Sequence, residues 1–484
     1  MILSFDFGTG GIKAALFDDG GKLLRDAFSG YGTLYPAEGM HEQRPADWWG
    51  AVIESSRALG DLSQVRAIGV SGHSLGVVPL DAEGRLLRDS VPIWSDSRAA
   101  REAREFGADD GWYLRTGCGF PAGLYSVFKL MWFRAHEPEW FGRTATVLGT
   151  KDWINFRLCG IPATDNSYAT GTGVYDLRTR TYAPDLVARS GLPPEIFPRI
   201  VPSTEVLGEV LPGVAAELGL PSGVKVVAGG VDNSCMALGA GAFTDGRAYA
   251  SLGSSAWIAV SGSSPVLDVK TRPYVFDHVV PGQYASALAV FSAGTSHVWL
   301  RDVLGLDFAE MDRLAEESGR GANGLFFNPS LAGGSSLDPS PSLRGGFSGI
   351  ELRHTRGDLS RAVMEGIAYG LRTALEGLDA SVRVSDPVIL TGGGAKSALW
   401  RRIYADVFGR TVVPSAIGQQ CAALGAAAVA AVGAGLWRDF SPVAELSAVG
   451  DAVYPDPDAA EFHRAAYGRF LSLSRHLAAW GEGC

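Results

Sequence analysis

One short pattern occurs twice in this chain, about half a chain apart. Residues 6–10 are Asp-Phe-Gly-Thr-Gly, and residues 251–255 are Ser-Leu-Gly-Ser-Ser. In both places an apolar run ends at a glycine, a hydroxyl residue and a small residue follow, and a second apolar run begins. The repeat predicts two domains of related topology, each opening with a hairpin whose turn fits a phosphate. Two unrelated hairpins would give the same pattern, so the repeat alone leaves both interpretations open.

The order of apolar runs and turn residues predicts an α/β fold. In the first half we expect strands at 2–7, 12–18, 22–30, 64–70, 90–93 and 224–228, with helices at 45–59 and 233–240. In the second half we expect strands at 247–252, 256–261, 388–391 and 411–413, with helices at 358–378, 397–408 and 420–436. Such alternation is typical of a sheet that contains parallel strands and carries helices on its faces. The Gly-rich stretch 239–246 suggests a boundary between domains at 1–242 and 243–484.

Composition excludes several classes of protein. The net charge of −10 disfavours nucleic acid as a partner, since such binding depends on neutralising phosphates. The most apolar stretch, 424–436, is too short to cross a membrane and is better explained as a buried helix. The N-terminus lacks the charged and apolar regions of a signal peptide. The five cysteines form no CxxC pair, so we expect a reduced protein in the cytoplasm.

The first glycine turn is a candidate phosphate cradle. Consecutive small residues allow backbone N–H groups to approach an anion, and Thr9 adds a hydroxyl donor. Lys13 adds a positive charge, and Asp6 could hold a hydrated Mg²⁺. A plain glycine hairpin explains the same residues equally well.

Asp232 follows an apolar strand and is preceded by Gly229 and Gly230. Working carboxylates in α/β folds commonly lie at the carboxyl end of a buried strand, and a carboxylate is a suitable general base for a hydroxyl. The local alternative, which the residues alone favour, is that Asp232 caps the following helix.

Three weaker candidates also follow strands. Asp96 and Arg98 lie beside an indole in the segment 94–98 (Trp-Ser-Asp-Ser-Arg), which suits a polyol, although a surface ion pair is commoner. His73 could contact a ligand or be a structural histidine. The glycines at 392–394 could lie against an adenosine. Residues 394–397 (Gly-Ala-Lys-Ser) lack the glycine that a Walker loop requires, and neither a dinucleotide fingerprint nor a zinc motif occurs.

Taken together, the motifs resemble the FGGY carbohydrate kinases, which belong to the superfamily of sugar kinases, actin and heat-shock chaperones. The resemblance spans nearly the whole chain. It rests on residues 6–13, the segments 39–43 and 47–49, the W-x-D-x-R segment 94–98, Ser126, Lys129 and Trp132 of a first signature, residues 253–255, a second signature at 345–365, and the segments 392–395 and 424–427.

The resemblance implies a two-domain sugar-kinase/actin-like (ribonuclease-H-like) fold and transfer of a phosphoryl group from Mg-ATP to a sugar in the cleft between the domains. Asp232 would be the catalytic base, which overrides the local preference for a cap. The sugar would be bound by His73, Asp96, Arg98, Asp232 and Asn233. The nucleotide would be bound by Asp6, Thr9, Gly10, Lys13, Gly253, Ser254, Ser255, Gly393, Gly394, Ala395 and Ser397. Mg²⁺ would be held by Asp6 and Asp232.

The resemblance is greatest to the xylulose-kinase branch, so a ketopentose such as xylulose or ribulose is the expected substrate. However, Ser74 and Leu75 replace the branch's usual Met-His pair, and a glutamate expected near Gln420 is also replaced. Kinases for fuculose, gluconate or erythritol therefore stay open, as does a non-catalytic sugar sensor on the same fold. An actin-like ATPase is disfavoured because such proteins lack the W-x-D-x-R segment. Partners are a sugar or polyol and ATP, without nucleic acid or membrane. Some members of the family form homodimers, and the sequence does not decide between monomer and dimer.

Overall fold

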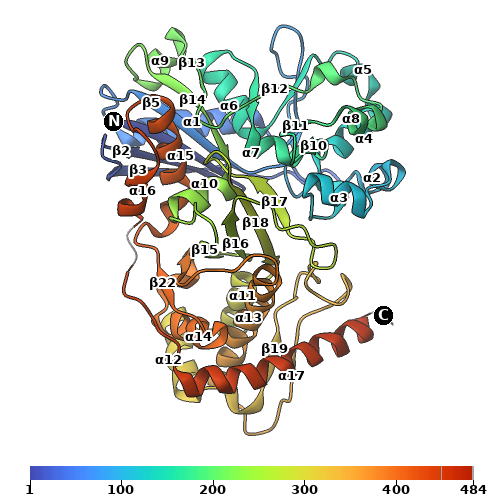
Figure 1. The fold of residues 1–484 in the computed structure, drawn as a ribbon, viewed down its shortest axis with the longest axis vertical. Coiled ribbons are helices and arrows are strands. Elements are labelled where there is room, and N and C mark those ends of the chain that lie inside the picture. Colours follow the sequence, from blue (N-terminus) through green and yellow to red (C-terminus); the bar gives the residue numbers. More distant parts are fainter. Residues whose placement is uncertain (448–449, 482–484) are drawn as a thin grey trace.

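The structure is a computed structural model and describes residues 1–447 and 450–481. It contains two α/β domains, drawn one above the other in Figure 1, and each is built around a six-stranded sheet. The α/β fold expected from the sequence is confirmed. The division of the chain at 242/243 remains a proposal.

The first sheet has the strand order β13-β14-β5-β1-β2-β3. Its strands are β1 (Ile2–Gly8), β2 (Gly11–Phe17), β3 (Leu23–Gly30), β5 (Ala67–Gly72), β13 (Val206–Glu209) and β14 (Lys225–Val231). β1, β2 and β3 form an antiparallel meander, whereas β5 runs parallel to β1, and β14 runs parallel to β5. β1 is buried along nearly its whole length because helices cover both faces of the sheet, which explains its almost continuous apolar sequence.

The second sheet repeats this plan with the order β17-β18-β16-β15-β21-β22. Its strands are β15 (Ala248–Leu252), β16 (Ala256–Gly262), β17 (Tyr274–Asp277), β18 (Tyr284–Val290), β21 (Val388–Thr391) and β22 (Val412–Pro414). β15 pairs antiparallel with β16 and parallel with β21, as β1 pairs with β2 and β5. The two hairpin turns predicted from the sequence repeat therefore occupy equivalent places in the two domains.

Long helices cover the sheets. They are α1 (Pro45–Leu59), α6 (Thr150–Cys159), α10 (Asp232–Gly239) and α15 (Cys421–Gly433) at the first sheet, and α11 (Gly294–Leu304), α12 (Phe308–Ser318), α13 (Arg356–Asp379), α14 (Ala398–Phe408) and α17 (Pro457–Gly481) in the second domain. α13 begins with a capping box in which Thr355 and Asp358 accept each other's backbone N–H groups. α17 lies along the bottom of the molecule in Figure 1.

The remaining helices and strands lie outside the two six-stranded sheets and the helices listed above. In the first half they are β4 (Glu42–Gln43), β6 (Val78–Leu80), β7 (Val91–Pro92), α2 (Ala100–Phe106), α3 (Asp110–Thr116), α4 (Ser126–His136), α5 (Pro138–Phe141), β8 (Thr146–Leu148), β9 (Ala163–Asp165), α7 (Asn166–Ala169), β10 (Tyr175–Asp176), β11 (Thr181–Tyr182), α8 (Pro184–Ser190), β12 (Arg199–Val201) and α9 (Pro212–Leu218). In the second half they are β19 (Phe326–Asn328), β20 (Gly346–Ser348) and α16 (Ser441–Leu446). Helices α2, α3, α4, α5 and α8 gather to the right of the first sheet in Figure 1.

α15 connects the two domains. Although it comes late in the chain, it packs against β1, β5, β14 and α10 of the first domain. Its sequence is almost entirely small and apolar and its side chains are buried, as the sequence predicted for residues 424–436. None of the helices within residues 1–447 and 450–481 is long and apolar enough to span a membrane.

Several predicted boundaries are shifted by a few residues. β5 begins at Ala67, whereas a strand was expected from residue 64, and α15 ends at Gly433, three residues before the predicted end. α10 begins at Asp232, and its N-cap is Val231, so the local prediction of Asp232 as the cap is wrong. Its carboxylate instead accepts the backbone N–H of the adjacent Asn233 at 2.8 Å.

Candidate active site between the domains

The carboxyl ends of three parallel strands bring the candidate acidic residues together. Asp6 on β1 pairs with Ser71 on β5, and Ser71 pairs with Gly230 on β14. Ser71 Oγ donates a hydrogen bond to Asp6 Oδ1 at 3.0 Å. Asp232 lies two residues beyond Gly230, at the start of α10. Residues far apart in sequence therefore meet at one edge of the first sheet, as expected for an α/β fold.

A bulge in β14 sets the direction in which the chain leaves the sheet toward Asp232. The register between β14 and β5 shifts between Val227 and Gly230. Gly229 has φ +73°, and a Cβ at this position would lie 2.0 Å from the carbonyl oxygen of Val70. Only glycine fits this backbone geometry, and bulges of this kind commonly re-aim a side chain next to an active site.

Burial and mutual repulsion change the acidity of the two carboxyl groups. Desolvation and, to a smaller extent, the negative charge of Asp6 raise the pKa of Asp232 to about 7. Burial also raises the pKa of Asp6, although Lys13 and the Ser71 hydroxyl oppose that change. A carboxylate whose pKa lies near neutral pH is suited to take up a proton in that range.

The first predicted phosphate turn is exposed above this edge. Thr9 and Gly10 are exposed, while Lys13 is half-buried opposite Asp6 in the hairpin register. Trp94 Nε1 donates a hydrogen bond to Thr9 Oγ1 at 2.9 Å, which ties the turn to the W-x-D-x-R segment. Lys13 Nζ reaches the backbone carbonyl of Gln419 at 3.4 Å, so it also contacts the late segment that leads into α15.

The second domain presents two turns side by side. Because β15 and β21 are parallel neighbours, the turn at 253–255 and the turn at 392–394 leave the sheet at the same edge. Gly253 and Ser254 are exposed, and Ser255 is half-buried. The carbonyl of Ser254 accepts the backbone N–H of Thr295 at 3.0 Å, so the start of α11 holds this turn.

The predicted adenosine residues lie in and after the second of these turns. Gly393 is exposed, Gly394 is half-buried and Ala395 is buried. Ser397 caps α14, since its Oγ accepts the Trp400 backbone N–H at 3.1 Å. At Gln420, where the family's glutamate was expected, the side-chain amide donates to Asp26 Oδ2 at 3.1 Å. This contact joins the nucleotide side of the second half to β3 of the first domain.

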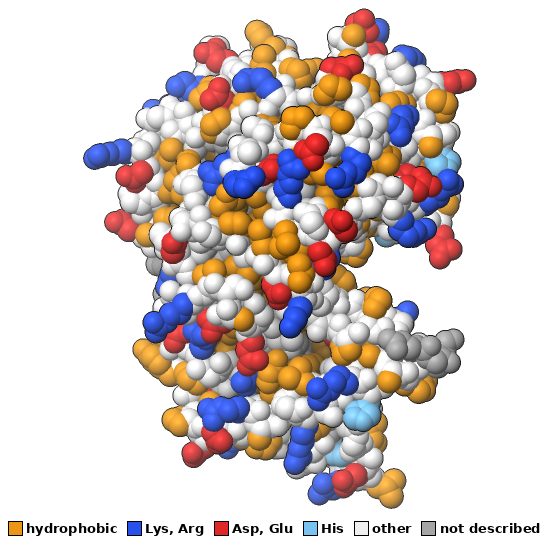
Figure 2. Space-filling view, turned by 45° about the vertical axis from the view of Figure 1, so that its right-hand side comes forward, with side chains coloured by type: hydrophobic (Ala, Val, Ile, Leu, Met, Phe, Trp, Pro, Cys, Tyr) orange, Lys and Arg blue, Asp and Glu red, His pale blue; other side chains and the backbone are white. Residues whose placement is uncertain are grey.

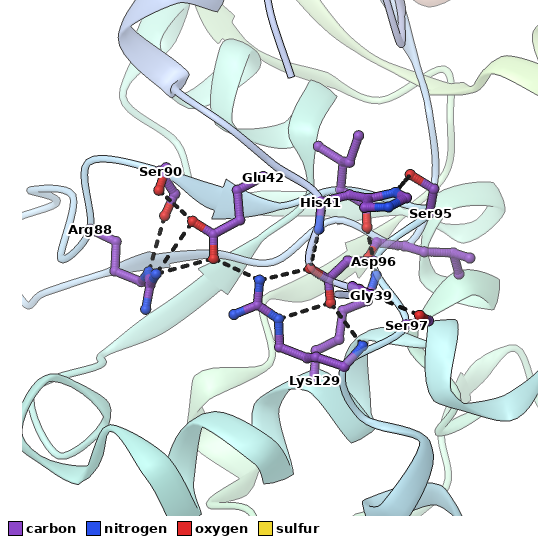
Figure 3. A network of polar contacts seen from close by, with 12 residues as sticks. Gly39, His41, Glu42, Arg88, Ser90, Ser95, Asp96, Ser97 and Lys129 are labelled. Carbon is purple, nitrogen blue, oxygen red and sulfur yellow. Dashed lines mark hydrogen bonds and ion pairs between the residues drawn. The ribbon is translucent and has the colours of Figure 1, made fainter. Parts of the chain in front are cut away.

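Asp96 and Arg98 are part of a buried ionic network. Asp96 accepts the His41 backbone N–H at 2.8 Å and Arg98 Nε at 2.9 Å. Arg98 also pairs with Glu42 at 2.6 Å, and Glu42 in turn contacts Arg88 and Ser90 (Figure 3). The Asp96 and Arg98 side chains are 0% and 2% exposed, so they hold each other and the 39–42 segment in place. Their proposed contact with sugar stays a prediction.

His73 is also buried. Its backbone N–H donates to the carbonyl of Phe7 at 3.1 Å, and its ring lies 3.4 Å from Thr150 Oγ1 and edge-on to Trp48. Burial lowers the pKa of His73 to about 4, so the ring is neutral at physiological pH. A direct contact of this ring with sugar stays a prediction.

Three aromatic residues that were not among the predicted site residues lie close to them. Trp94 is 37% exposed beside the first turn. Trp257 follows the second turn, and its Nε1 donates to the Tyr249 hydroxyl, which donates to the backbone carbonyl of Asn233. The sequence offered one signal, the position of each tryptophan next to a predicted motif. The contacts of Trp257 and Tyr249 with Asn233 follow only from the packing of the second sheet against α10.

A cavity lies between the first and second halves of the chain, and none of the predicted site residues is part of its lining. It has a volume of about 420 Å³, and its lining includes Phe120 of the first half and Tyr274 and Phe291 of the second. The rings of Phe120 and Tyr274 stack with centroids 4.1 Å apart. Figure 2 shows that the surface is deeply hollowed where the two domains meet. Small polar molecules commonly bind in hollows of this kind between domains.

The donors for a cation are few. Within residues 1–447 and 450–481 no cluster of three or more His, Cys, Asp or Glu side chains could hold a metal ion. Mg²⁺ does not need such a cluster, because it commonly binds one or two carboxylates together with substrate phosphates and water. Asp6 and Asp232 are the carboxylates predicted for that role, and the negative charge of Asp6 contributes to the raised pKa of Asp232.

Two domains of this topology, with carboxylates and glycine turns facing a shared cleft, define the sugar-kinase/actin-like fold. Family models agree: the N-terminal domain of the FGGY family of carbohydrate kinases matches residues 1–239, and the C-terminal domain of that family matches residues 248–434. The chain therefore belongs to the FGGY family of carbohydrate kinases, and it is an ATP-dependent sugar phosphotransferase.

Individual relatives are similar along their whole length. The xylulose kinase of Bacillus subtilis (strain 168) is 30% identical over 98% of this chain and 97% of its own. The crystal structure of xylulose kinase from Rhodospirillum rubrum matches with a TM-score of 0.90 at 32% identity, covering 99% of both chains. The structure of gluconate kinase from Lactobacillus acidophilus matches with a TM-score of 0.91 at 25% identity, covering 99% of this chain and 98% of that one.

Proposed function

We propose that this kinase phosphorylates a neutral ketopentose such as xylulose or ribulose, with Asp232 as the general base. The observation that carries the proposal is the position of Asp232. It lies at the carboxyl end of a buried strand, next to Asp6, with a pKa raised to about 7 by burial. A base of that strength can accept a proton from a hydroxyl near neutral pH.

The proposed reaction needs few chemical groups. The carboxylate of Asp232 takes the proton of the sugar hydroxyl, and the hydroxyl oxygen forms a bond to the γ-phosphorus of ATP. The bond from the γ-phosphorus to the β,γ-bridging oxygen breaks, and ADP leaves with the electron pair. Such transfer depends mainly on in-line positioning and neutralisation of charge.

The two glycine turns and Lys13 are suited to the nucleotide. Thr9, Gly10, Gly253 and Ser254 are exposed in turns at the ends of their strands, where backbone N–H groups can meet phosphate oxygens. Asp6 and Asp232 would hold Mg²⁺, which when bound supplies further positive charge to the phosphates. Residues 393–395 and Ser397 would flank the adenosine, as the family resemblance implies.

Two features support a neutral sugar over a sugar acid. Arg98 and Lys129 are both buried; Arg98 pairs with Asp96 and Glu42, and Lys129 donates to two backbone carbonyls. Neither cation is available to a substrate carboxylate. Trp94 and Trp257 instead offer apolar rings, which suit the carbon skeleton of a polyol, while their N–H groups already donate to Thr9 and Tyr249. The similarity to several xylulose kinases supports the same substrate class.

The test is a coupled assay of ADP release with Mg-ATP and D-xylulose, D-ribulose, L-fuculose, D-gluconate, erythritol or glycerol. We expect the highest kcat/KM for one of the two pentuloses and at least a hundredfold loss of that activity in Asp232→Asn. A clear preference for gluconate would refute the neutral-sugar assignment. The homodimer stays a prediction as well, to be checked by light scattering.

A further inference from the structure

The first family signature places a buried lysine against the sugar side of the cleft. Lys129 lies on α4 and is 0% exposed. Its Nζ donates to two backbone carbonyls, that of Leu75 at 3.0 Å and that of Ile93 at 2.7 Å. Figure 3 shows Lys129 beside the Asp96 network. A buried ammonium group is costly unless its hydrogen bonds are made, and here two of its three donors are used on the main chain.

The two carbonyls belong to the two segments that face the proposed sugar. Leu75 lies in the loop 73–76, whose first residue donates its backbone N–H to Phe7 just before the first phosphate turn. Ile93 immediately precedes Trp94, and its carbonyl also accepts the Asp96 backbone N–H at 3.1 Å. One side chain therefore joins the sugar loop to the W-x-D-x-R segment.

Leu75 has an unusual backbone conformation. Its φ is +63°, in the left-handed region that leucine rarely adopts, and its side chain is buried at 1% exposure. Such a conformation persists only when the surroundings enforce it. Lys129 binds the carbonyl of this residue, and Ser126, one helical turn earlier on α4, donates to the next carbonyl, that of Gly76, at 3.2 Å.

We propose that Ser126 and Lys129 clamp the backbone of the sugar loop, and that Lys129 is the positioning residue that fixes Leu75 and Trp94 for sugar binding. The spacing of three residues puts both side chains on one face of α4, which explains the motif spacing. The clamp acts on backbone atoms, so it holds the loop in place whatever side chains stand at Ser74 and Leu75. This inference rests on the proposed sugar site.

The principal variant is Lys129→Met, which has a similar length but cannot donate. We expect the KM for the preferred pentulose to rise at least tenfold, while the KM for ATP changes less than twofold. Amide hydrogen exchange in the protein without substrate should become at least tenfold faster in residues 73–76 and 94–96. A purely structural role would not confine the changes to the sugar side.

Leu130→Ala is the matched control. Leu130 neighbours Lys129 on α4 and is 1% exposed, so its truncation loosens the same helix without touching either carbonyl bond. We expect its sugar KM and its loop exchange to match the wild type. If Lys129→Met does not yield folded protein, Lys129→Leu, which also lacks N–H donors, provides the same two readouts.

An unchanged sugar KM in the folded Lys129 variant, or equal effects in Leu130→Ala, would overturn the clamp. So would faster exchange spread evenly over the first domain. The exchange experiment needs no substrate. A wild-type protein that phosphorylates none of the sugars would therefore refute the proposed function, while exchange in residues 73–76 and 94–96 still decides the clamp.

Discussion

Replacing Asp232 with asparagine tests the proposed chemistry most directly. The substitution removes the proton acceptor but keeps the size of the side chain and an oxygen that can accept the Asn233 N–H. We expect ATP binding to persist and phosphoryl transfer to fall by about 10²-fold or more, the usual contribution of a general base. In the wild type, kcat/KM should fall as the pH drops below about 7, because the base becomes protonated. At one pH unit below this pKa, roughly a tenth of the full activity should remain.

The raised pKa of Asp232 also predicts how the stability of the folded protein depends on pH. Raising the pKa of Asp232 from 3.8 to about 7 corresponds to roughly 4 kcal/mol of preference for the neutral form. Because the side chain is only partly buried, solvent reduces this figure, and we expect about 1–2 kcal/mol. The folded state binds the extra proton, so wild-type stability should decline between pH 4 and 7 relative to Asp232→Asn and stay lower by a constant amount above pH 7.

The assays are ADP release across pH 5.5–9 and urea unfolding at pH 4 and 8. Asp406→Asn is the matched control, since Asp406 is a half-buried carboxyl group on α14 whose pKa is also raised by burial. It should leave the pH midpoint of kcat/KM unchanged. Turnover of Asp232→Asn within threefold of the wild type would refute the base assignment. If kcat/KM of the wild type does not fall as the pH drops below about 7, the argument that burial raises the pKa of Asp232 is refuted.

Three further predictions concern the surroundings of the base. Trp94→Ala should raise the KM for the sugar about tenfold in steady-state kinetics, because it removes the exposed ring and its hydrogen bond to Thr9. An unchanged KM would place the sugar elsewhere. Arg98→Met should lower the free energy of unfolding by about 3–5 kcal/mol in urea at pH 7, since it leaves the buried negative charge of Asp96 without its ion-pair partner. A decrease below 1 kcal/mol would contradict this prediction. Chelation with EDTA should abolish turnover, and added Mg²⁺ should restore it; full activity in excess EDTA would argue against the cation.

The linear sequence determined the local elements and the order of the motifs. Apolar runs bounded by glycine predicted β1, β2, β15 and β16 to within a residue or two, because strand periodicity and turn chemistry are local properties. The position of Asp232 directly after a buried strand was also visible, since six apolar or small residues directly precede it. The small-residue stretch near residue 424 predicted a buried helix for the same reason.

The tertiary structure decided which of these residues share a site and which support it. Asp96 and Arg98 form a buried network with Glu42, a residue more than fifty positions earlier, and no local pattern encodes that pairing. The two carbonyl bonds of Lys129 and the left-handed Leu75 likewise depend on how α4 packs against two distant loops. Contacts between residues far apart in sequence depend on the relative placement of whole elements. Local periodicity fixes the elements, and packing alone brings these partners together.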